Sequence, residues 1–363
     1  MKKIKVKAES REYPVYIGKN IFPSLHSLMQ EKEMNQNAYV VVDNNVLEIH
    51  KKSVELFLAK KFKKVYLLQF NSSEKNKSSK SVERIYNSLI KNGYGRDSVI
   101  VAIGGGITGD LVGFAASTYG RGIQFVQVPT TLLAAVDSSV GGKTGINYGS
   151  TKNLIGSFYQ PEFVLIDINF LRTLPEEEII CGVGEIIKYA YLSDQKLFDL
   201  LTKELKSLLS LKPGITENII ETCVRFKASV VASDEKETGL RKILNLGHTF
   251  AHAFEVEQHF SIKHGQAVTI GLICALYLSH QLGFISESQL EKYLVLPLSL
   301  QNKIHLDGCN VEAIYKIMLR DKKSREGKIK FVLLTEPGKL LIDVEAEKDQ
   351  VIKAIEDGVS HFI

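Results

Sequence analysis

The sequence predicts an α/β amino-terminal domain of Rossmann-like type, with a mainly parallel sheet, followed by a mostly α-helical carboxy-terminal domain. In the first half, short β-branched runs alternate with longer amphipathic stretches, as they do in α/β units. Beyond about residue 175 helical periodicity dominates instead. A length of 363 residues suits two domains, which we expect at 1–175 and 176–363.

The elements of the first domain are expected in the order strand, helix, strand, helix, strand. Buried strands are predicted at residues 39–42, 65–70, 99–103, 125–128 and 163–166. Helices are predicted at 46–62 and 81–92. In the second domain, helical periodicity covers 176–206, 216–233 and 249–282, and residues 328–334 and 339–344 flank a turn as a small hairpin.

Composition excludes several classes of protein. A formal charge of +5 is modest, and the lysine cluster at residues 60–64 lacks interleaved aromatic side chains, so we expect no nucleic-acid partner. The basic start of the chain is followed by no apolar signal region, and no apolar run is long enough to span a bilayer. The four cysteines are scattered without a CxxC pair, which favours a reducing cytoplasm.

A glycine-rich turn follows the third predicted strand and precedes an apolar helical run. It contains Gly104, Gly105, Gly106, Gly109 and Asp110. Glycines let a backbone approach a ligand closely, and the next helix offers free N–H groups to a pyrophosphate. The spacing is not GxGxxG, so other strand ends must support a dinucleotide site. Polar residues do follow two further strands, namely Asp43, Asn44, Thr130 and Thr131.

A second small-residue loop is expected over residues 137–147, followed closely by Lys152 and Asn153. Lys143 stands among its glycines and hydroxyl side chains, which favours binding of a phosphate. The loop is not a P-loop, because Asp137 occupies the position of that motif's first glycine.

Three histidines in the second domain fall within a short stretch. His248 and His252 share one face of a helix, and His264 follows a polar connection. Imidazoles with one carboxylate form catalytic zinc sites, and the candidate carboxylates are Glu185 and Glu255. Glu185 is favoured because it stands among apolar residues, where a buried charge needs a cation.

Several of these segments together resemble the 3-dehydroquinate synthase family over essentially the whole chain. The segments are GGGITGD, RGIQFVQVPTTLLAAVDSSVGGKTGIN, KNLIGSFYQP, GEIIKYA, RKILNLGHT and the pair His264-Gly265. The resemblance implies a dehydroquinate synthase-like fold, NAD as cofactor, a divalent metal that is Zn²⁺ or Co²⁺, and a homodimer.

The resemblance also implies roles for individual residues. The metal ligands would be Glu185, His248 and His264, which leaves His252 to the substrate. NAD contacts would be Asp43, Asn44, Glu74, Lys77, Gly105, Gly106, Gly109, Asp110, Thr130, Thr131, Asp137, Lys143, Lys152 and Thr173. Substrate contacts would be Asp137, Lys143, Lys152, Asn153, Lys188, Lys227, Arg241, Asn245 and His252, with Arg121 lent across the dimer. Catalytic roles would fall to Lys143, Lys188, Lys227, Arg241, Asn245 and His252.

The implied reaction converts 3-deoxy-D-arabino-heptulosonate 7-phosphate into 3-dehydroquinate and phosphate, which is a step of the shikimate pathway to aromatic amino acids. It runs through transient oxidation at C5 by NAD, elimination of phosphate, re-reduction and an intramolecular aldol reaction. That chemistry is a carbon–oxygen lyase reaction acting on a phosphate.

The sequence departs from the family pattern at three places. They are residues 148–151, residues 71–77 and Ala251, which replaces the usual glycine between the paired histidines. Three alternatives therefore stay open: a sister cyclase that forms inosose or valiolone rings, a metal-dependent polyol dehydrogenase, and a binding protein without catalytic activity. Retention of Lys152, Asn153, Lys227, Arg241 and Asn245 favours a carboxylate-bearing substrate and hence the synthase.

Overall fold

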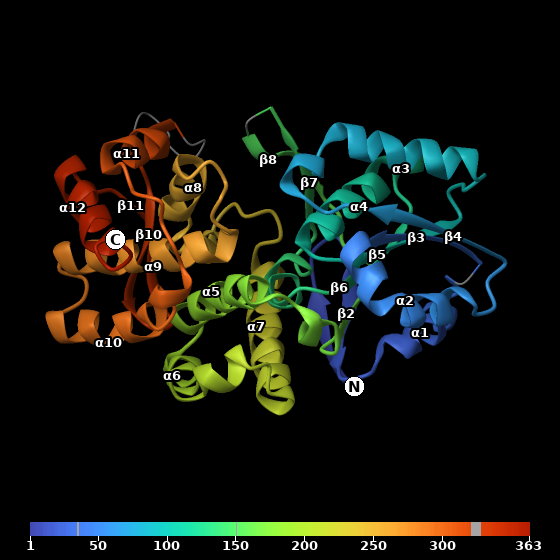
Figure 1. Ribbon diagram of the computed structural model, residues 1–363, viewed down its shortest axis with the longest axis horizontal. Helices are drawn as coiled ribbons and strands as arrows, with labels where there is room; N and C mark the ends of the chain where they lie inside the picture. The colour runs from blue at the N-terminus through green and yellow to red at the C-terminus, as the bar shows by residue number, and fades with distance from the viewer. Residues whose placement is uncertain (35, 150, 321–327) are drawn as a thin grey trace. The chain divides into compact units, whose positions relative to one another are not determined.

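The computed structural model describes residues 1–34, 36–149, 151–320 and 328–363. The chain forms two compact units. The first comprises residues 1–175 and 213–236, and the second comprises residues 176–212 and 237–363. Each unit is described by itself below (Figure 1).

The first unit is built on a seven-stranded sheet with the order β1-β2-β9-β6-β5-β3-β4. Its strands are β1 (Lys2–Lys7), β2 (Glu12–Gly18), β3 (Asn37–Asp43), β4 (Lys64–Phe70), β5 (Ser98–Gly104), β6 (Gln124–Pro129) and β9 (Phe163–Asp167). Strand β1 runs antiparallel to β2, and the other pairs are parallel. The predicted mainly parallel sheet is confirmed, and the five predicted strands correspond to β3, β4, β5, β6 and β9.

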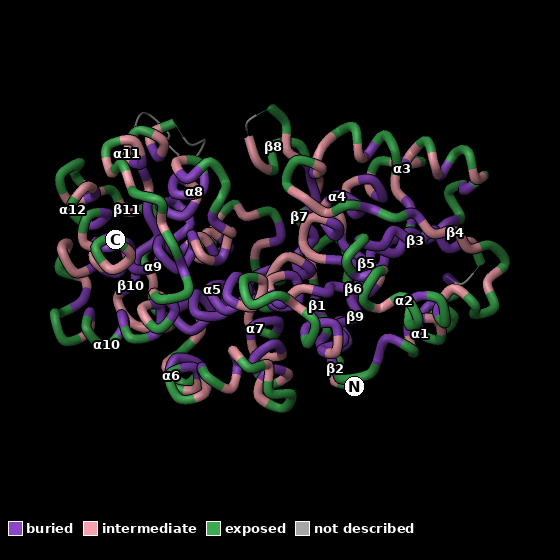
Figure 2. Tube along the Cα trace, viewed as in Figure 1, coloured by how far each residue is buried: buried purple, intermediate pink, exposed green. Residues whose placement is uncertain are grey.

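The central strands β3 and β5 are buried along almost their whole length, so both faces of the sheet are covered there (Figure 2). Alternate residues of β3 enter different hydrophobic clusters, because successive side chains of a strand point to opposite faces. Val40 and Val42 belong to one cluster, and Tyr39 and Val41 belong to the other. Continuous apolar runs such as 99–103 are therefore explained by a sheet covered on both sides.

Helices and a separate hairpin complete the first unit. The helices are α1 (Leu25–Glu31), α2 (Asn44–Leu58), α3 (Ser79–Lys91), α4 (Gly106–Thr118) and α7 (Pro213–Ser233). The hairpin pairs β7 (Lys143–Tyr148) with β8 (Thr151–Phe158). The expectation of a loop throughout 137–147 is wrong, since a π-helical turn (Ala134–Ser138) and β7 occupy much of it.

The second unit is mostly helical. Its elements are α5 (Glu176–Leu192), α6 (Gln195–Leu209), α8 (His248–Glu257), α9 (His264–Gln281), α10 (Glu287–Leu298), α11 (Val311–Arg320), α12 (Lys348–Val359) and the hairpin β10 (Phe331–Glu336) with β11 (Lys339–Val344). Helix α9 is its centre, because α5, α8, α10, α12 and β10 all pack on it. The predicted helical character and the terminal hairpin are confirmed.

Two long periodic stretches prove to be pairs of helices. Residues 249–282 are interrupted where His259 and Phe260 adopt left-handed backbone angles, which end α8 before α9 begins. Residues 176–206 are interrupted at Asp194, whose side chain accepts the Leu197 N–H and starts α6. Periodicity alone did not reveal either break, because both helices of each pair bury an apolar face.

The assignment of residues 1–175 and 176–363 to two domains with different functions stays a prediction. In packing, helix α7 differs from that division, because it lies against β1, β2 and the 134–138 turn and so belongs to the first unit. Its apolar residues, among them Ile219, Ile220 and Val224, are fully buried there. Among the residues described, no helix is long and apolar enough to cross a membrane.

Candidate active site

Some of the predicted dinucleotide residues of the first unit, namely Asp43, Asn44, Gly105 and Gly106, follow the carboxyl ends of β3 and β5. These strands are neighbours in the sheet, and the connection that leaves β3 runs to β4 on one side, whereas the connection that leaves β5 runs to β6 on the other side. Open parallel sheets bind ligands at such a switch point. Asp43 ends β3, and its carboxylate accepts the N–H groups of Asn45, Val46 and Ser72. It therefore caps α2, and that role is compatible with the predicted ribose contact.

The glycine-rich turn is required by close packing of α4 against the sheet. A Cβ on Gly109 would lie 2.0 Å from Gln127 Nε2, and one on Gly105 would lie 3.0 Å from the Thr131 methyl carbon. The Thr130 N–H donates to Gly104 O over 2.9 Å. These contacts hold the amino terminus of α4 beside the ends of β5 and β6, as a phosphate-binding turn needs.

A polar cluster centred on Lys77 joins four segments of the first unit. The buried Lys77 Nζ lies 2.6 Å from Asp110 Oδ2 and 2.5 Å from Asn153 Oδ1. Asn147 binds Glu74 Oε2 over 2.8 Å and accepts the Asn153 N–H over 2.9 Å. Burial raises the pKa of Asp110, and the adjacent Lys77 charge limits that rise. We name these residues, with Lys152 at 3.8 Å from Glu74, the Lys77 cluster.

Sequence reasoning gave no role to Asn147, although the family-like segment contained it. Its two partners lie 73 and 6 residues away, so spacing offered no signal for the contacts. Of the departures from the family pattern, residues 71–77 form a short helical turn (Glu74–Asn76) that supplies Glu74 and Lys77 to this cluster. Ser150, within the departure at 148–151, lies outside the described residues.

Another ion pair of the first unit joins Asp137 and Lys227. The Lys227 Nζ lies 2.8 Å from both the carbonyl oxygen and Oδ1 of Asp137. Lys227 belongs to α7 and is 6% exposed. Packing of α7 on this unit thus brings together two predicted substrate residues that are 90 positions apart.

Some predicted residues are not brought together. Lys143 and Lys152 lie toward opposite ends of the β7–β8 hairpin, because Lys143 pairs with Phe158 while Thr151 pairs with Tyr148. Arg121 follows the carboxyl end of α4, about 20 Å of helix from the glycine-rich turn. Thr173 ends the 3-10 turn Phe170–Thr173, and its hydroxyl oxygen lies 2.9 Å from His50 Nε2. Asn44 is exposed at the first position of α2.

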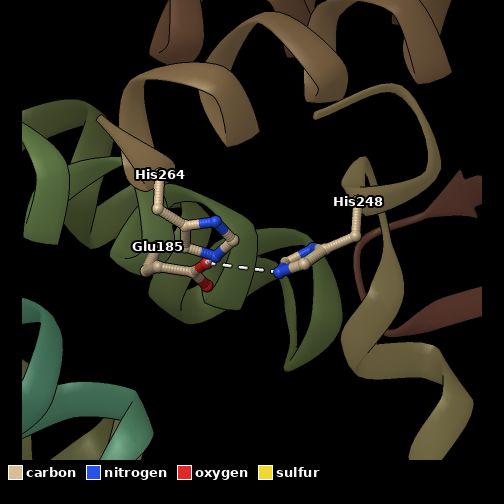
Figure 3. Close-up of side chains that lie close together, drawn as sticks. All are labelled: Glu185, His248 and His264. Atoms are coloured by element: carbon tan, nitrogen blue, oxygen red, sulfur yellow. Dashed lines mark ion pairs between the residues drawn. The ribbon is translucent and has the colours of Figure 1, made fainter. Parts of the chain in front are cut away.

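In the second unit, Glu185 of α5, His248 of α8 and His264 of α9 converge on one point (Figure 3). Glu185 Oε1 lies 3.4 Å from His248 Nε2 and 3.3 Å from His264 Nε2. The three donor atoms lie within 4.8 Å of one another, and Glu185 is fully buried. Among the described residues this is the group whose spacing suits a metal ion.

The geometry fits a small divalent cation. Ligand atoms about 2.0–2.1 Å from a tetrahedral ion are about 3.3–3.4 Å apart, which matches both distances. Neither oxygen of Glu185 accepts a hydrogen bond of good geometry from the described residues, although Lys188 Nζ lies 2.5 Å from Oε2. Two imidazole nitrogens and one carboxylate oxygen are a donor set typical of catalytic zinc with an open position.

Electrostatics also favours a positive charge at this point. Burial raises the pKa of Glu185, but the charge of Lys188 and the contacts with the two imidazoles outweigh burial and hold it well below the usual range. Burial and Lys188 lower the pKa of His248 to about 4. Burial lowers the pKa of His264, but Glu185 and Glu255 outweigh it and raise this pKa to about 10. Glu185 is therefore ionised and His248 is a neutral donor, while the proton on His264 is what a bound cation would replace.

Glycines set the spacing of the two helices that carry Glu185 and His264. A Cβ on Gly265 would lie 1.8 Å from Cys181 O, and a Cβ on Gly184 would lie 2.1 Å from Gly265 O. Both obstacles are backbone atoms, which cannot turn aside. The predicted GEIIKYA and His264-Gly265 segments thus owe their glycines to the approach of α5 and α9.

The other predicted residues of this unit surround the three donors or lie on the neighbouring turn. The His252 ring lies 5.6 Å from that of His248 and 6.2 Å from that of His264, and it is not one of the converging donors. Arg241 is 1% exposed in the 3-10 turn before α8. Asn245, in the same turn, donates to Glu237 Oε1 over 2.7 Å.

A glycine-rich switch point in an α/β unit and a metal-type donor set in a helical unit are the features of an NAD- and metal-dependent enzyme. A solved structure of 2-deoxy-scyllo-inosose synthase, complexed with carbaglucose-6-phosphate, NAD⁺ and Co²⁺, is similar with a TM-score of 0.88. It is 27% identical and covers 98% of this chain and 100% of its own.

Comparison of the sequence with known families identifies the family to which the chain belongs. Models described as 3-dehydroquinate synthase N-terminal and 3-dehydroquinate synthase C-terminal match residues 67–181 and 182–324. The 3-dehydroquinate synthase of Pelagibacter ubique is 42% identical over 345 residues, with 93% of each chain covered. That of Dictyoglomus thermophilum is 40% identical, with 99% of each chain covered. The chain belongs to the 3-dehydroquinate synthase family, which confirms the resemblance found in its motifs.

Proposed function

We propose that the protein is a 3-dehydroquinate synthase that converts 3-deoxy-D-arabino-heptulosonate 7-phosphate into 3-dehydroquinate and phosphate, as a carbon–oxygen lyase of the shikimate pathway. The observation that carries the proposal is identity of 40–42% to synthases over at least 93% of both chains. The sister cyclase of known structure has the same fold at 27% identity, which favours the synthase over an inosose-forming enzyme.

The residues of each unit suit their proposed tasks. Glu185, His248 and His264 would hold a Zn²⁺ or Co²⁺ ion, which when bound polarises a substrate oxygen as a Lewis acid. The end of β5 and the start of α4 would hold the NAD pyrophosphate, with Asp43 beside a ribose. NAD would be used catalytically and not consumed, so we expect no net accumulation of NADH.

The basic side chains would bind the anionic groups of the substrate. Lys143, Lys152, Lys188, Lys227 and Arg241 carry positive charges for its carboxylate and phosphate, and charge-assisted hydrogen bonds are the strong ones. Asn245 is oriented by Glu237, which leaves its amide oxygen as an acceptor for a substrate hydroxyl. His252 lies close enough to the three donors to contact a hydroxyl of a substrate bound there.

Two further parts of the proposal concern assembly and location. We assign Arg121 to the partner's site of a homodimer, because it lies at the end of α4 remote from the glycine-rich turn of its own chain. The buried cysteine side chains are present as thiols, which supports a reducing cytoplasm.

The test is release of inorganic phosphate from the heptulosonate phosphate by the full chain, with metal and NAD each omitted in turn. Release that requires both, without net formation of NADH, is expected. Glucose 6-phosphate and sedoheptulose 7-phosphate serve as comparison substrates. Release from either of these, with none from the heptulosonate, would assign a sister cyclase; net NADH from a polyol would assign a dehydrogenase.

A further inference from the structure

Glu255 is a buried carboxylate of the helical unit to which the proposed reaction gives no task. It lies on α8, its side chain is 3% exposed, and its Oε1 is 3.5 Å from His264 Nδ1. An ionised group that is removed from water needs a compensating partner, so its place beside a donor of the candidate metal centre has to be explained.

The two imidazoles of the centre are oriented in the same manner. His248 directs Nε2 toward Glu185 and lies with Nδ1 3.2 Å from Leu246 O. His264 directs Nε2 toward Glu185 and Nδ1 toward Glu255. A neutral imidazole has one N–H and one lone pair, so an acceptor at Nδ1 leaves the lone pair on Nε2. Each ring therefore meets an oxygen on the side away from the centre.

The two acceptors differ in charge. Leu246 offers an uncharged backbone carbonyl, whereas Glu255 offers a carboxylate, which increases the basicity of the ring it binds. Glu255 stands seven residues after His248, which is two turns along α8 and on the same face. One helix thus carries one donor of the centre and holds the donor that comes from α9.

We propose that Glu255 is a positioning residue of the metal centre, which accepts the Nδ1–H of His264 and so fixes the ring with its Nε2 lone pair toward Glu185. This inference rests on the proposed function only in taking the centre to bind a divalent cation. It also explains why the two carboxylates near the histidines have different tasks: they lie at opposite nitrogens of His264.

The test compares Glu255→Gln with Glu257→Gln in the full chain. Glu257 lies on the same helix and accepts the Asn310 N–H over 3.0 Å, so the control makes the same chemical change away from His264. Co²⁺ affinity is measured by competition with a chelating dye, and the visible spectrum of bound Co²⁺ reports ligand geometry. Glu255→Gln is expected to bind Co²⁺ about 10- to 100-fold more weakly with an altered spectrum, whereas Glu257→Gln matches the wild type.

Equal Co²⁺ affinity and equal spectra for both variants would overturn the proposal. If Glu255→Gln does not fold, the wild type decides the matter through ¹⁵N-histidine NMR of the Zn²⁺-loaded protein. Protonated Nδ1 and metal-bound Nε2 at His264 support the proposal, and the reverse arrangement sinks it. Failure of the proposed function looks different: tight metal binding by the wild type with no phosphate released from the heptulosonate phosphate.

Discussion

The two polar centres of this protein both place a lysine beside a carboxylate, but they differ in what else faces that carboxylate. In the Lys77 cluster the chain supplies its own cation, since Lys77 lies 2.6 Å from Asp110 and is 5% exposed. At Glu185, two imidazoles and a carboxylate direct donor atoms to one point. The first centre is an ion-pair network of the chain's own side chains, whereas the second also has the composition of a site for an added cation.

The backbones that carry these centres differ as well. The Lys77 cluster is assembled from a short turn, the β7–β8 hairpin and the first turns of α4, and most of its contacts join side chains. The Glu185 donors stand on three helices, two of which approach through Gly184 and Gly265. A catalytic ion needs donors held to within a fraction of an ångström, and packed helices supply that rigidity better than turns.

The largest effect is expected from removing a donor of the second centre. His248→Ala should lose the bound metal and lower kcat by about 10³-fold or more, because a Lewis acid contributes several kcal/mol and each ~1.4 kcal/mol is tenfold. Metal content by mass spectrometry and phosphate release measure this. His305→Ala, at an exposed histidine of the same unit, is the control. Wild-type turnover by metal-depleted His248→Ala protein would refute the assignment of this centre.

A smaller effect is expected from enlarging the glycine between the helices. Gly265→Ala places a methyl group 1.8 Å from Cys181 O, so α5 and α9 must separate, at about 3 kcal/mol of unfolding free energy. Urea unfolding followed by circular dichroism measures the change. Gly214→Ala, in α7 with nothing within 4 Å, should instead be neutral or stabilising by up to about 1 kcal/mol. Equal urea midpoints for Gly265→Ala and wild type would contradict the close approach.

The smallest of the three effects is expected at the Lys77 cluster. Lys77→Met leaves Asp110 without its cation and should lower the free energy of unfolding by about 2 kcal/mol. This is less than the ~3–5 kcal/mol lost when a fully buried ion pair is broken, because the Asp110 side chain is partly exposed. The exposed Lys80→Met is the control. The variant should also bind NAD more weakly, which calorimetry would show.

This effect should depend on pH with a defined sign. Burial raises the pKa of Asp110 above its ordinary value of 3.8, so the folded protein holds this proton more readily than the unfolded chain. The stability that Asp110 contributes is therefore lost as pH rises from the pKa of this group in the unfolded chain to its higher pKa in the folded protein. Loss of Lys77 raises this pKa further, so the deficit of Lys77→Met should be larger at pH 8 than at pH 5. A deficit that shrinks toward pH 8 would show that Lys77 does not stabilise the Asp110 carboxylate.

Much of the fold was predictable because its determinants are local. The β-branched runs of β3, β4, β5, β6 and β9 are bounded by polar residues, and each was recognised within two residues of its ends. Helix α7 shows where this fails: its periodicity was clear, but the unit to which it belongs depends on packing against β1 and β2. The same limit hid the contact of Asn147 with Glu74, because packing between segments 73 residues apart creates this contact.

The sequence by itself determined the fold class, the glycine-rich turn and the family, because composition, periodicity and ordered motifs are properties of the chain. It also supplied three histidines and two carboxylates for a metal centre, and the resemblance favoured one set. Only the tertiary structure showed that Glu185 and Glu255 face opposite nitrogens of His264. The nitrogen of the His264 ring that each carboxylate reaches depends on how α5, α8 and α9 pack against one another. Spacing along the chain cannot predict this packing.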